Sequence, residues 1–334
     1  MSLISKYITL KEYIPSGNPE LNHFGINNEN ISLDNSNNVC VKNEWISVDP
    51  YMRARMTEKK NYKPPFELNK PMEGSAIGKV IESKVSDIKV GDIVRSDYGW
   101  RDLFVAPSSK LIKIDTINVP IQTYLGPLGF TGHTAYIGLF KIGSLKKGET
   151  ILVSSAAGSV GSTVCQIAKI MGCKVVASTG SDEKVNWLKN ELGVDEAFNY
   201  NKIDNLVLHL KALAPEGYDL YFDNVGGEFL ESAIFRMKNY GKIVICGRIS
   251  QMNASTPHGL KNMAHVLVKR LTIKGFLIFD HFNDYDDFEK DMKNWILNNQ
   301  IQWKETIIEG LENAPKAFID LLNGKNTGKM LVKI

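Results

Sequence analysis

The spacing of the hydrophobic residues changes near Leu125. Before that point, short apolar runs are separated by Gly, Pro, Asn and Asp, which is typical of strands joined by turns. This pattern predicts strands at 39–48, 75–83, 92–95 and 103–106, and a polar loop at 27–38. We therefore expect the first third of the chain to form an irregular β domain.

Beyond Leu125, apolar runs suited to strands alternate with stretches of helical period. The run at 150–155 predicts a strand buried on both faces, and the apolar positions from Val160 to Met171 then fall on one side of a helix that ends at Gly172. Ser181 is a plausible N-cap for a helix that continues to about Leu192. Further strands are expected at 174–178, 196–199, 220–223, 243–246 and 273–279, and a further helix at 132–140. This alternation predicts an α/β fold with a doubly wound parallel sheet.

The pattern of the first third returns after Trp303. It predicts a strand at 304–309, a helix at 314–322 and a final strand at 329–334. We therefore expect a discontinuous first domain, made of residues 1–123 and 300–334, and a second domain made of residues 124–299.

Composition and charge restrict the classes of function. The chain is 43% hydrophobic and 23% charged, and its net charge of +3 is spread among interleaved acids and bases. This is typical of a globular protein and gives no reason to expect a nucleic-acid partner. No apolar run approaches the roughly 20 residues that cross a bilayer, and residues 1–10 carry no secretory pattern. The cysteines lie at scattered positions, so we expect reduced, buried thiols in a cytoplasmic protein: Cys40, Cys165, Cys173 and Cys246.

The segment Ala156-Ala157-Gly158-Ser159-Val160-Gly161 has the form A-x-G-x-x-G. It follows a predicted strand and opens a predicted helix, which is the context of a dinucleotide-binding turn. Gly158 would let the backbone approach a pyrophosphate, and Gly161 would let the helix pack closely on the strand. The free N–H groups at the helix start attract phosphates. The alternative is a tight strand–helix turn without a ligand.

The end of the next strand favours NADPH over NADH. NAD-binding proteins carry an acidic residue about 20 residues after the glycine turn, for the ribose hydroxyls. Here the strand ends in Ser178-Thr179-Gly180, without an acid, and Lys184 follows in the next helix. A lysine at this place can bind the 2′-phosphate of NADPH, although a solvated helix lysine is the alternative.

With other segments in the same order, the glycine turn resembles the medium-chain dehydrogenase/reductase superfamily, and in particular its zinc-independent branch of prostaglandin reductases and leukotriene B4 12-hydroxydehydrogenases, with curcumin-reductase-like bacterial members. The resemblance covers nearly the whole chain. The further segments that carry it are Ser47-Val48-Asp49-Pro50-Tyr51-Met52-Arg53, Thr134-Ala135-Tyr136, Gly180-Ser181-Asp182-Glu183-Lys184, Phe198-Asn199-Tyr200, Tyr221-Phe222-Asp223-Asn224-Val225-Gly226-Gly227, Ile245-Cys246-Gly247, Ile249-Ser250-Gln251 and Lys325-Asn326-Thr327-Gly328-Lys329.

The resemblance implies a GroES-like β domain followed by a Rossmann domain, usually in a homodimer. It also implies reduction of the C=C bond of α,β-unsaturated aldehydes and ketones by NADPH. The positions that it assigns to the cofactor are Gly158, Ser159, Val160, Gly161, Lys184, Tyr200, Asn224, Cys246, Gly247, Ser250, Phe276, Leu277, Ile278 and Asn326. Taken singly, several of these fit ordinary turn or core chemistry equally well.

Zinc-dependent members of the superfamily need three protein ligands and an open metal position. Their motif places a histidine before Glu-Gly, where this chain has Met72-Glu73-Gly74. No cluster of four cysteines is present for a structural zinc, and the six histidines show no ligand spacing, so we expect them at the surface or in loops. The sequence therefore predicts an enzyme without a metal.

Without a metal, hydrogen bonds must polarise the substrate carbonyl. Hydride would pass from the nicotinamide to the β-carbon, and the resulting enolate would take a proton at the α-carbon. Tyr51 is the candidate for orienting the carbonyl, and a tyrosine packed beneath the site is the alternative. Arg55 is either a tether for an acidic substrate tail or a charge at the surface or at the domain interface. Relatives often have a tyrosine where this chain has Met252, whose thioether cannot supply a proton.

Two other functions remain open at this stage. The same two domains occur in quinone oxidoreductases. A protein that binds NADPH without turnover would also satisfy the glycine turn and Lys184.

Overall fold

A computed structural model describes residues 3–33, 38–116 and 118–334 of the chain. The chain divides into two units, which are described separately. Unit 1 comprises Met1–Leu125, Glu305–Asn326 and Met330–Ile334, and unit 2 comprises Gly126–Lys304 with Thr327–Lys329. The sequence placed the corresponding boundaries at 123/124 and 299/300.

Unit 2 is built on a six-stranded parallel sheet with the order β10-β9-β8-β11-β12-β13. The central strands are almost fully buried, because helices cover both faces and no strand needs a polar side. This explains why they read as continuous apolar runs. The strands are β8 (Thr150–Val153), β9 (Lys174–Thr179), β10 (Glu196–Asn199), β11 (Tyr218–Asp223), β12 (Met237–Ile245) and β13 (Thr272–Gly275).

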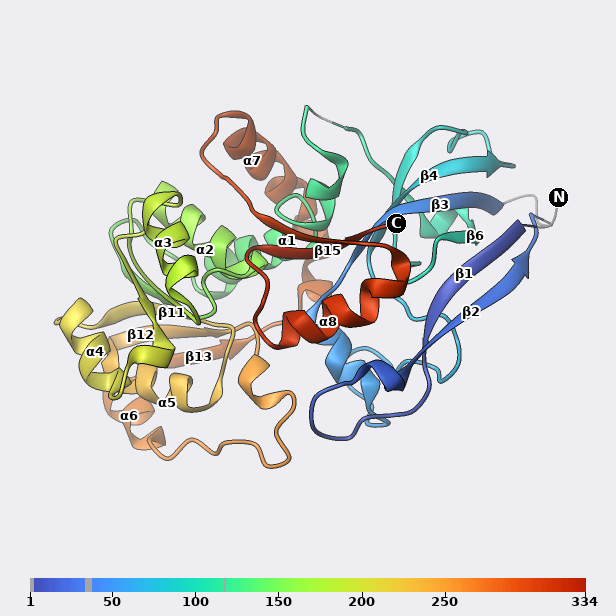
Figure 1. Cartoon of the computed structure of the whole chain (residues 1–334). Helices are drawn as coiled ribbons and strands as arrows, with labels where there is room; N and C mark the ends of the chain where they lie inside the picture. Colours follow the sequence, from blue (N-terminus) through green and yellow to red (C-terminus); the bar gives the residue numbers. More distant parts are fainter. Residues whose placement is uncertain (1–2, 34–37, 117) are drawn as a thin grey trace. The chain divides into compact units, whose positions relative to one another are not determined.

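The helices of unit 2 follow the strands alternately. In Figure 1, α1, α2 and α3 lie on one side of the sheet, and α4, α5 and α6 lie on the other. A buried apolar cluster joins the second group to the strands through residues such as Leu210, Ala233 and Tyr221. The helices are α1 (Phe130–Ile137), α2 (Ser159–Ile170), α3 (Asp182–Asn190), α4 (Leu206–Leu213), α5 (Gly227–Arg236), α6 (Met263–Lys269) and α7 (Tyr285–Leu297).

Unit 1 contains a seven-stranded sheet with the path β14-β15-β3-β4-β5-β7, in which β6 also pairs with β3. A separate antiparallel pair joins β1 to β2. Trp100 is fully buried at the centre of the main core, edge-on to Phe318 of helix α8 (Ala314–Leu322). The strands are β1 (Leu3–Leu10), β2 (Phe24–Ile31), β3 (Asn38–Ser47), β4 (Ala76–Ser83), β5 (Ile93–Ser96), β6 (Leu103–Pro107), β7 (Ile112–Lys113), β14 (Glu305–Glu309) and β15 (Lys329–Lys333). The expected fold class, a β domain with a doubly wound parallel sheet domain, is confirmed.

Two predictions of secondary structure from the sequence are wrong. The polar loop expected at 27–38 is strand as far as Ile31, because β2 pairs along its whole length with β1, which the sequence did not predict as a strand. Residues 34–37 of that predicted loop lie outside the described residues. The strand expected at 273–279 ends at Gly275, where its pairing with β12 ends.

His133 also departs from its prediction, because it is buried within α1 instead of lying at the surface. Its ring stacks on Phe288 at 4.9 Å and meets Tyr285 edge-on at 5.3 Å between centroids. It therefore joins the aromatic contact between α1 and α7.

Among the described residues, every helix is too short or too polar to cross a bilayer.

Candidate functional site

The site in unit 2 lies at the carboxyl ends of its parallel strands. The chain moves from β8 outward to β9 and β10, and then returns to the other side of β8 to form β11, β12 and β13. The order reverses between β8 and β11. In open parallel sheets this reversal leaves a crevice at the carboxyl edge, where ligands bind.

The glycine turn lies at the end of the central strand β8. Gly158 is the N-cap of α2, and no side chain in the described part of the chain caps this helix end. Its first backbone N–H groups therefore lack the intrahelical acceptors that later turns have. A Cβ at Gly161 would lie 2.4 Å from the carbonyl oxygen of Ser155, so only glycine lets α2 start this close to the strand. The turn thus presents donors to an anion at the end of the sheet.

The end of β9 packs closely on a residue that follows β10. A Cβ on Gly180 would lie 2.9 Å from the hydroxyl of Tyr200, which follows β10 and is 46% exposed. The Asn201 side-chain amide donates to the Gly180 carbonyl at 2.9 Å. Tyr200 therefore lies directly against the end of β9. The strand next to β9 is β8, which the glycine turn follows.

Asp182 is the acidic residue nearest to the end of β9, and it is already engaged. It accepts a hydrogen bond from Asn199 at 3.0 Å and pairs with Lys202. The hydrogen bond from Lys202 is the main reason why the pKa of this carboxyl is lowered. Asp182 is thus held on the side of β10, and the end of β9 offers no acidic group in the place where NAD-binding proteins have one.

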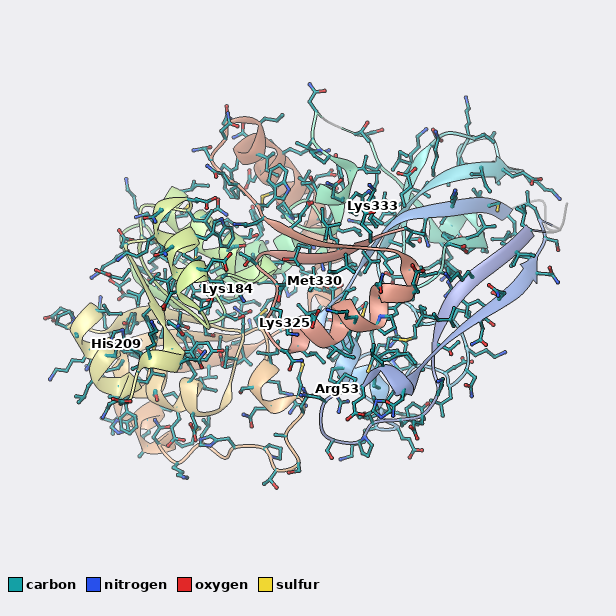
Figure 2. All side chains as sticks on the ribbon, viewed as in Figure 1. Arg53, Lys184, His209, Lys325, Met330 and Lys333 are labelled. Atoms are coloured by element: carbon teal, nitrogen blue, oxygen red, sulfur yellow. The ribbon has the colours of Figure 1, made fainter. Side chains whose placement is uncertain are left out.

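Lys184, labelled in Figure 2, lies in the first turn of α3, the helix that follows β9. Ser181 caps this helix as predicted, with its hydroxyl accepting from the Lys184 N–H at 3.3 Å. The Lys184 side chain is half-buried, and burial lowers the pKa of its ammonium group, while the carboxylate of Glu183 opposes that shift. A dianionic phosphate beside a partly desolvated ammonium would gain more than one beside a fully solvated lysine.

Across the reversal point, a buried carboxyl joins β8 to β11. Oδ1 of Asp223 accepts from the Tyr221 hydroxyl at 2.6 Å and from the N–H groups of Val225 and Gly226, each at 2.9 Å. The hydroxyl of Ser154, the residue after β8, also donates to it at 3.3 Å. Burial is the largest influence on Asp223 and raises the pKa of the carboxyl above its ordinary value.

The same network fixes the backbone and side chain of Asn224. Its side-chain amide donates to the Ser154 carbonyl at 2.8 Å, and its N–H donates to the Ser154 hydroxyl at 3.0 Å. Gly247 packs on this residue, since a Cβ there would lie 3.0 Å from the Asn224 carbonyl oxygen. The Ser250 hydroxyl donates to the Val225 carbonyl at 2.7 Å. Three predicted cofactor positions, Asn224, Gly247 and Ser250, are therefore brought together after β11 and β12.

The remaining predicted positions are more buried or lie elsewhere. Cys246 directly follows β12, and burial raises the pKa of its thiol to about 12, so it is not a reactive nucleophile. Phe276, Leu277 and Ile278 follow β13; a Cβ on Gly138 would lie 3.2 Å from the Phe276 ring, and Ile278 is buried. Asn326 is buried in unit 1, directly before the segment that belongs to unit 2.

In unit 1, Tyr51 lies in the short 3-10 helix Pro50–Met56 and packs against the main core. The ammonium of Lys63 lies 5.3 Å from the centre of its ring. Burial, with the nearby carboxylates of Asp49 and Asp97, raises the pKa of the Tyr51 hydroxyl well above its ordinary value. This phenol therefore stays protonated and can act only as a neutral donor or acceptor.

Arg55 is not the surface charge that one interpretation of the sequence expected. It is 4% exposed, donates to Glu73 and to the Pro64 carbonyl at 2.8 Å each, and lies 4.1 Å above the Phe66 ring. Two of its donors are thus already used to hold the segment between Pro64 and Glu73.

Three positions that shape this edge of the sheet were not assigned a role from the sequence: Ser154, Gly180 and Asp223. The signal for Asp223 was present, because the segment Tyr221–Gly227 was recognised as family-like, but only Asn224 was assigned a role. The importance of Ser154 and Gly180 depends on contacts with other strands, which no local pattern records.

The comparisons with known proteins agree with this geometry. Residues 6–114 match the family model of the N-terminal domain of oxidoreductase, and residues 159–297 match that of zinc-binding dehydrogenase. A 2-alkenal reductase (NADP(+)-dependent) from Nicotiana tabacum is 40% identical over 335 residues, which cover 99% of this chain and 97% of that protein. The chain belongs to the medium-chain dehydrogenase/reductase superfamily.

Other relatives place this medium-chain dehydrogenase/reductase in the branch that the sequence analysis named. Prostaglandin reductase 1 from Bos taurus is 40% identical, with 98% of this chain and 99% of that protein covered. The solved structure of CurA in complex with NADPH from Vibrio vulnificus superimposes with a TM-score of 0.92 at 35% identity, over 98% of each chain.

One of the two family models is named for zinc, and the residues of this medium-chain dehydrogenase/reductase do not fit a zinc ion. Met72, at the position of the histidine ligand, is 1% exposed and packs in the apolar core of unit 1, while Glu73 pairs with Arg55. Across the described ranges of the chain, no three His, Cys, Asp or Glu side chains gather to hold a metal.

Proposed function

We propose that the chain is an NADPH-dependent reductase of the C=C bond of α,β-unsaturated aldehydes and ketones. The observation that carries this proposal is the uncapped N-terminus of α2 at the strand reversal, with Lys184 and no acidic group at the end of β9. The name of the tobacco relative, a 2-alkenal reductase, and the NADPH complex of CurA support the substrate class and the cofactor.

The residues of unit 2 bind and orient the cofactor in this proposal. The N–H groups from Ser159 to Gly161 bind the pyrophosphate, and Lys184 binds the 2′-phosphate. Tyr200 covers the adenosine side, while Asn224, Cys246, Gly247, Ser250 and the segment 276–278 lie along the nicotinamide side. The family resemblance also assigns Asn326 to the cofactor. NADPH, when bound, supplies a hydride to the β-carbon of the substrate.

Tyr51 donates a hydrogen bond to the substrate carbonyl as negative charge develops on its oxygen. Its raised pKa keeps the proton on the phenol. The phenol therefore acts as a neutral hydrogen-bond donor to the developing oxyanion. Met252 cannot deliver the proton that the α-carbon takes, because a thioether has none. Water or a ribose hydroxyl delivers it.

The function is tested by following NADPH oxidation with a panel of 2-alkenals, enones and quinones. We expect turnover of the alkenals and enones, with the C=C bond reduced and the carbonyl retained in the product. The variant Tyr51→Phe is expected to lower kcat by about 100-fold, the usual effect of removing one oxyanion donor. Turnover of quinones alone would establish the quinone oxidoreductase function instead. Tight NADPH binding without turnover of any of these substrates would establish a binding protein.

We further propose that the enzyme is a cytoplasmic homodimer that pairs through the β13 edge. The four cysteines are free, which is usual for reducing compartments. In the described chain β13 is hydrogen-bonded on one side only, to β12. Helix α6, which leads into β13, exposes Met263, Leu267 and Val268, with Leu267 79% exposed. An open strand edge flanked by apolar side chains can pair with its own copy about a two-fold axis.

Sedimentation velocity tests the dimer. The wild-type protein is expected to sediment as a dimer at micromolar concentration, and Leu267→Lys is expected to raise the dissociation constant at least tenfold, since it places a charge in an apolar contact. Leu208→Lys is the matched control, because Leu208 is 62% exposed on α4, at the other end of the sheet. A monomeric wild type, or equal effects of the two variants, would contradict this interface.

A further inference from the structure

Three residues of the C-terminal tail fold with unit 2, although the residues on both sides of them fold with unit 1. We call this segment, Thr327–Lys329, the strap. Met330, which directly follows it, and Lys325, two residues before it, are labelled in Figure 2. The N–H of Gly328 donates to the carbonyl of Ala157 at 2.8 Å, and Gly328 forms an isolated parallel bridge with Gly158. The glycine turn thus has a backbone partner that lies 170 residues away in the sequence, the difference between positions 328 and 158.

The strap completes the support of the glycine turn. On the side of β9, the N–H of Ala156 donates to the Ser178 carbonyl at 2.9 Å. The next peptide carbonyl, of Ala157, receives the N–H of Gly328. The two residues that precede Gly158 are therefore held from two sides, one by the sheet and one by the strap.

Only glycine fits at position 328. Its φ is +67°, and a Cβ would lie 1.8 Å from the carbonyl oxygen of Lys304. That same oxygen accepts the N–H of Lys329 at 2.9 Å. A side chain at 328 would therefore force the strap away from the Lys304 backbone, and Gly328 would move with it.

The Lys304 segment is itself fixed to the helix that the glycine turn begins. Gln302 and Gln166 of α2 form a reciprocal pair: the Gln302 N–H donates to the Gln166 side-chain oxygen, and the Gln166 amide donates to the Gln302 carbonyl, each at 2.8 Å. Strap, Lys304 segment and α2 thus form a closed frame around the turn.

We propose that the strap holds the glycine turn in the shape that binds the pyrophosphate, with Gly328 as the positioning residue. The inference rests on the proposed binding of NADPH at this turn. N–H groups that face an anion must be held in place before it binds, because ordering them on binding reduces affinity. The bond from Gly328 also keeps the negative end of the Ala157 carbonyl turned away from the phosphates.

The test compares Gly328→Ala with Gly324→Ala. Gly324 lies in the same tail with a φ of +66°, but nothing lies within 4 Å of a Cβ there, so both variants carry the same backbone strain and only one displaces the strap. We expect Gly328→Ala to raise the Kd and KM for NADPH at least tenfold, with kcat at saturating NADPH within about twofold of wild type. Gly324→Ala should bind NADPH as the wild type does.

Binding of adenosine 2′-monophosphate shows whether Gly328→Ala disturbs only the glycine turn or the whole cofactor site. It carries the phosphate that distinguishes NADPH but no pyrophosphate, so its Kd should be the same in wild type and Gly328→Ala. If Gly328→Ala does not fold, Gln166→Leu opens the frame at its other end and is expected to raise the Kd for NADPH about threefold, again without changing that of the nucleotide monophosphate.

Equal NADPH affinity of Gly328→Ala and Gly324→Ala would overturn the inference. So would a loss of adenosine 2′-monophosphate binding by the same factor as that of NADPH. A wild-type protein that binds no NADPH would instead refute the proposed function. Failure of the inference about the strap and failure of the proposed function therefore give different results.

Discussion

Replacing Asp223 with leucine is expected to lower the free energy of unfolding by about 3–5 kcal/mol. The substitution removes one oxygen that accepts from the Tyr221 hydroxyl and from two backbone N–H groups, those of Val225 and Gly226. The two backbone N–H groups then lose their acceptor, while the Tyr221 hydroxyl keeps the Ser154 hydroxyl as a second acceptor at 3.0 Å. Each unsatisfied buried donor costs about 1–3 kcal/mol. The measurement is urea unfolding followed by circular dichroism.

Two milder variants make this prediction specific. Tyr221→Phe removes one donor and leaves the carboxyl with its backbone partners, so it should cost about 1 kcal/mol. Asp223→Asn keeps an oxygen acceptor and should also cost far less than leucine. If leucine and asparagine proved equally destabilising, the hydrogen bonds to the carboxyl oxygen would not be the cause.

The pH dependence has a definite sign. Burial raises the pKa of Asp223 in the folded protein, so the folded state holds this proton more tightly than the unfolded state does. The resulting contribution to stability is fully present below the unfolded-state pKa and is lost as the pH rises through the folded-state pKa. The stability advantage of wild type over Asp223→Asn should therefore shrink as the pH rises above the ordinary pKa of an aspartate, about 3.9.

The second large effect concerns Lys184. Lys184→Glu is expected to raise the KM for NADPH about 100-fold and to leave the KM for NADH within about threefold of wild type. Loss of a charge-assisted hydrogen bond costs about 1.5–3 kcal/mol, roughly one to two factors of ten, and the new carboxylate adds repulsion from the 2′-phosphate. Initial-rate kinetics with both cofactors measure the effect.

Lys189→Glu is the matched control for Lys184→Glu. Lys189 is an exposed lysine in the same helix, five positions further on, and it pairs with Glu196 at 3.4 Å. It should change neither KM appreciably. Equal changes in the KM for NADPH and NADH in Lys184→Glu would mean that the helix was disturbed and that Lys184 does not recognise the 2′-phosphate.

Local patterns predicted the central part of unit 2 well. The segment from β8 through α2 to β9 combines a continuous apolar run, a glycine turn and a helical stripe, and each of these signals arises within a few residues. The cap at Ser181 was also found from sequence, because a capping hydroxyl bonds to a backbone only three positions away.

Three of the errors share one cause, which is a partner outside the local sequence pattern. The asparagine-rich stretch after Phe24 looks polar throughout, yet it is strand because β1 supplies hydrogen bonds along its length. Arg55 looks like a surface charge, yet it is buried because Glu73, the Pro64 carbonyl and the Phe66 ring surround its guanidinium. His133 is buried because α7 brings two aromatic rings to it.

The sequence by itself determined the fold class, the glycine turn, the helix that it opens and the absence of an acidic group after β9, since each depends on neighbouring residues. Only the tertiary structure decided how the turn is held. It places Ser178, Asp223 and Gly328 around the reversal of the sheet, from three separate parts of the chain. Hydrogen bonds and close packing act through space, so a residue such as Gly328 shows its role only when Lys304 and Ala157 lie beside it.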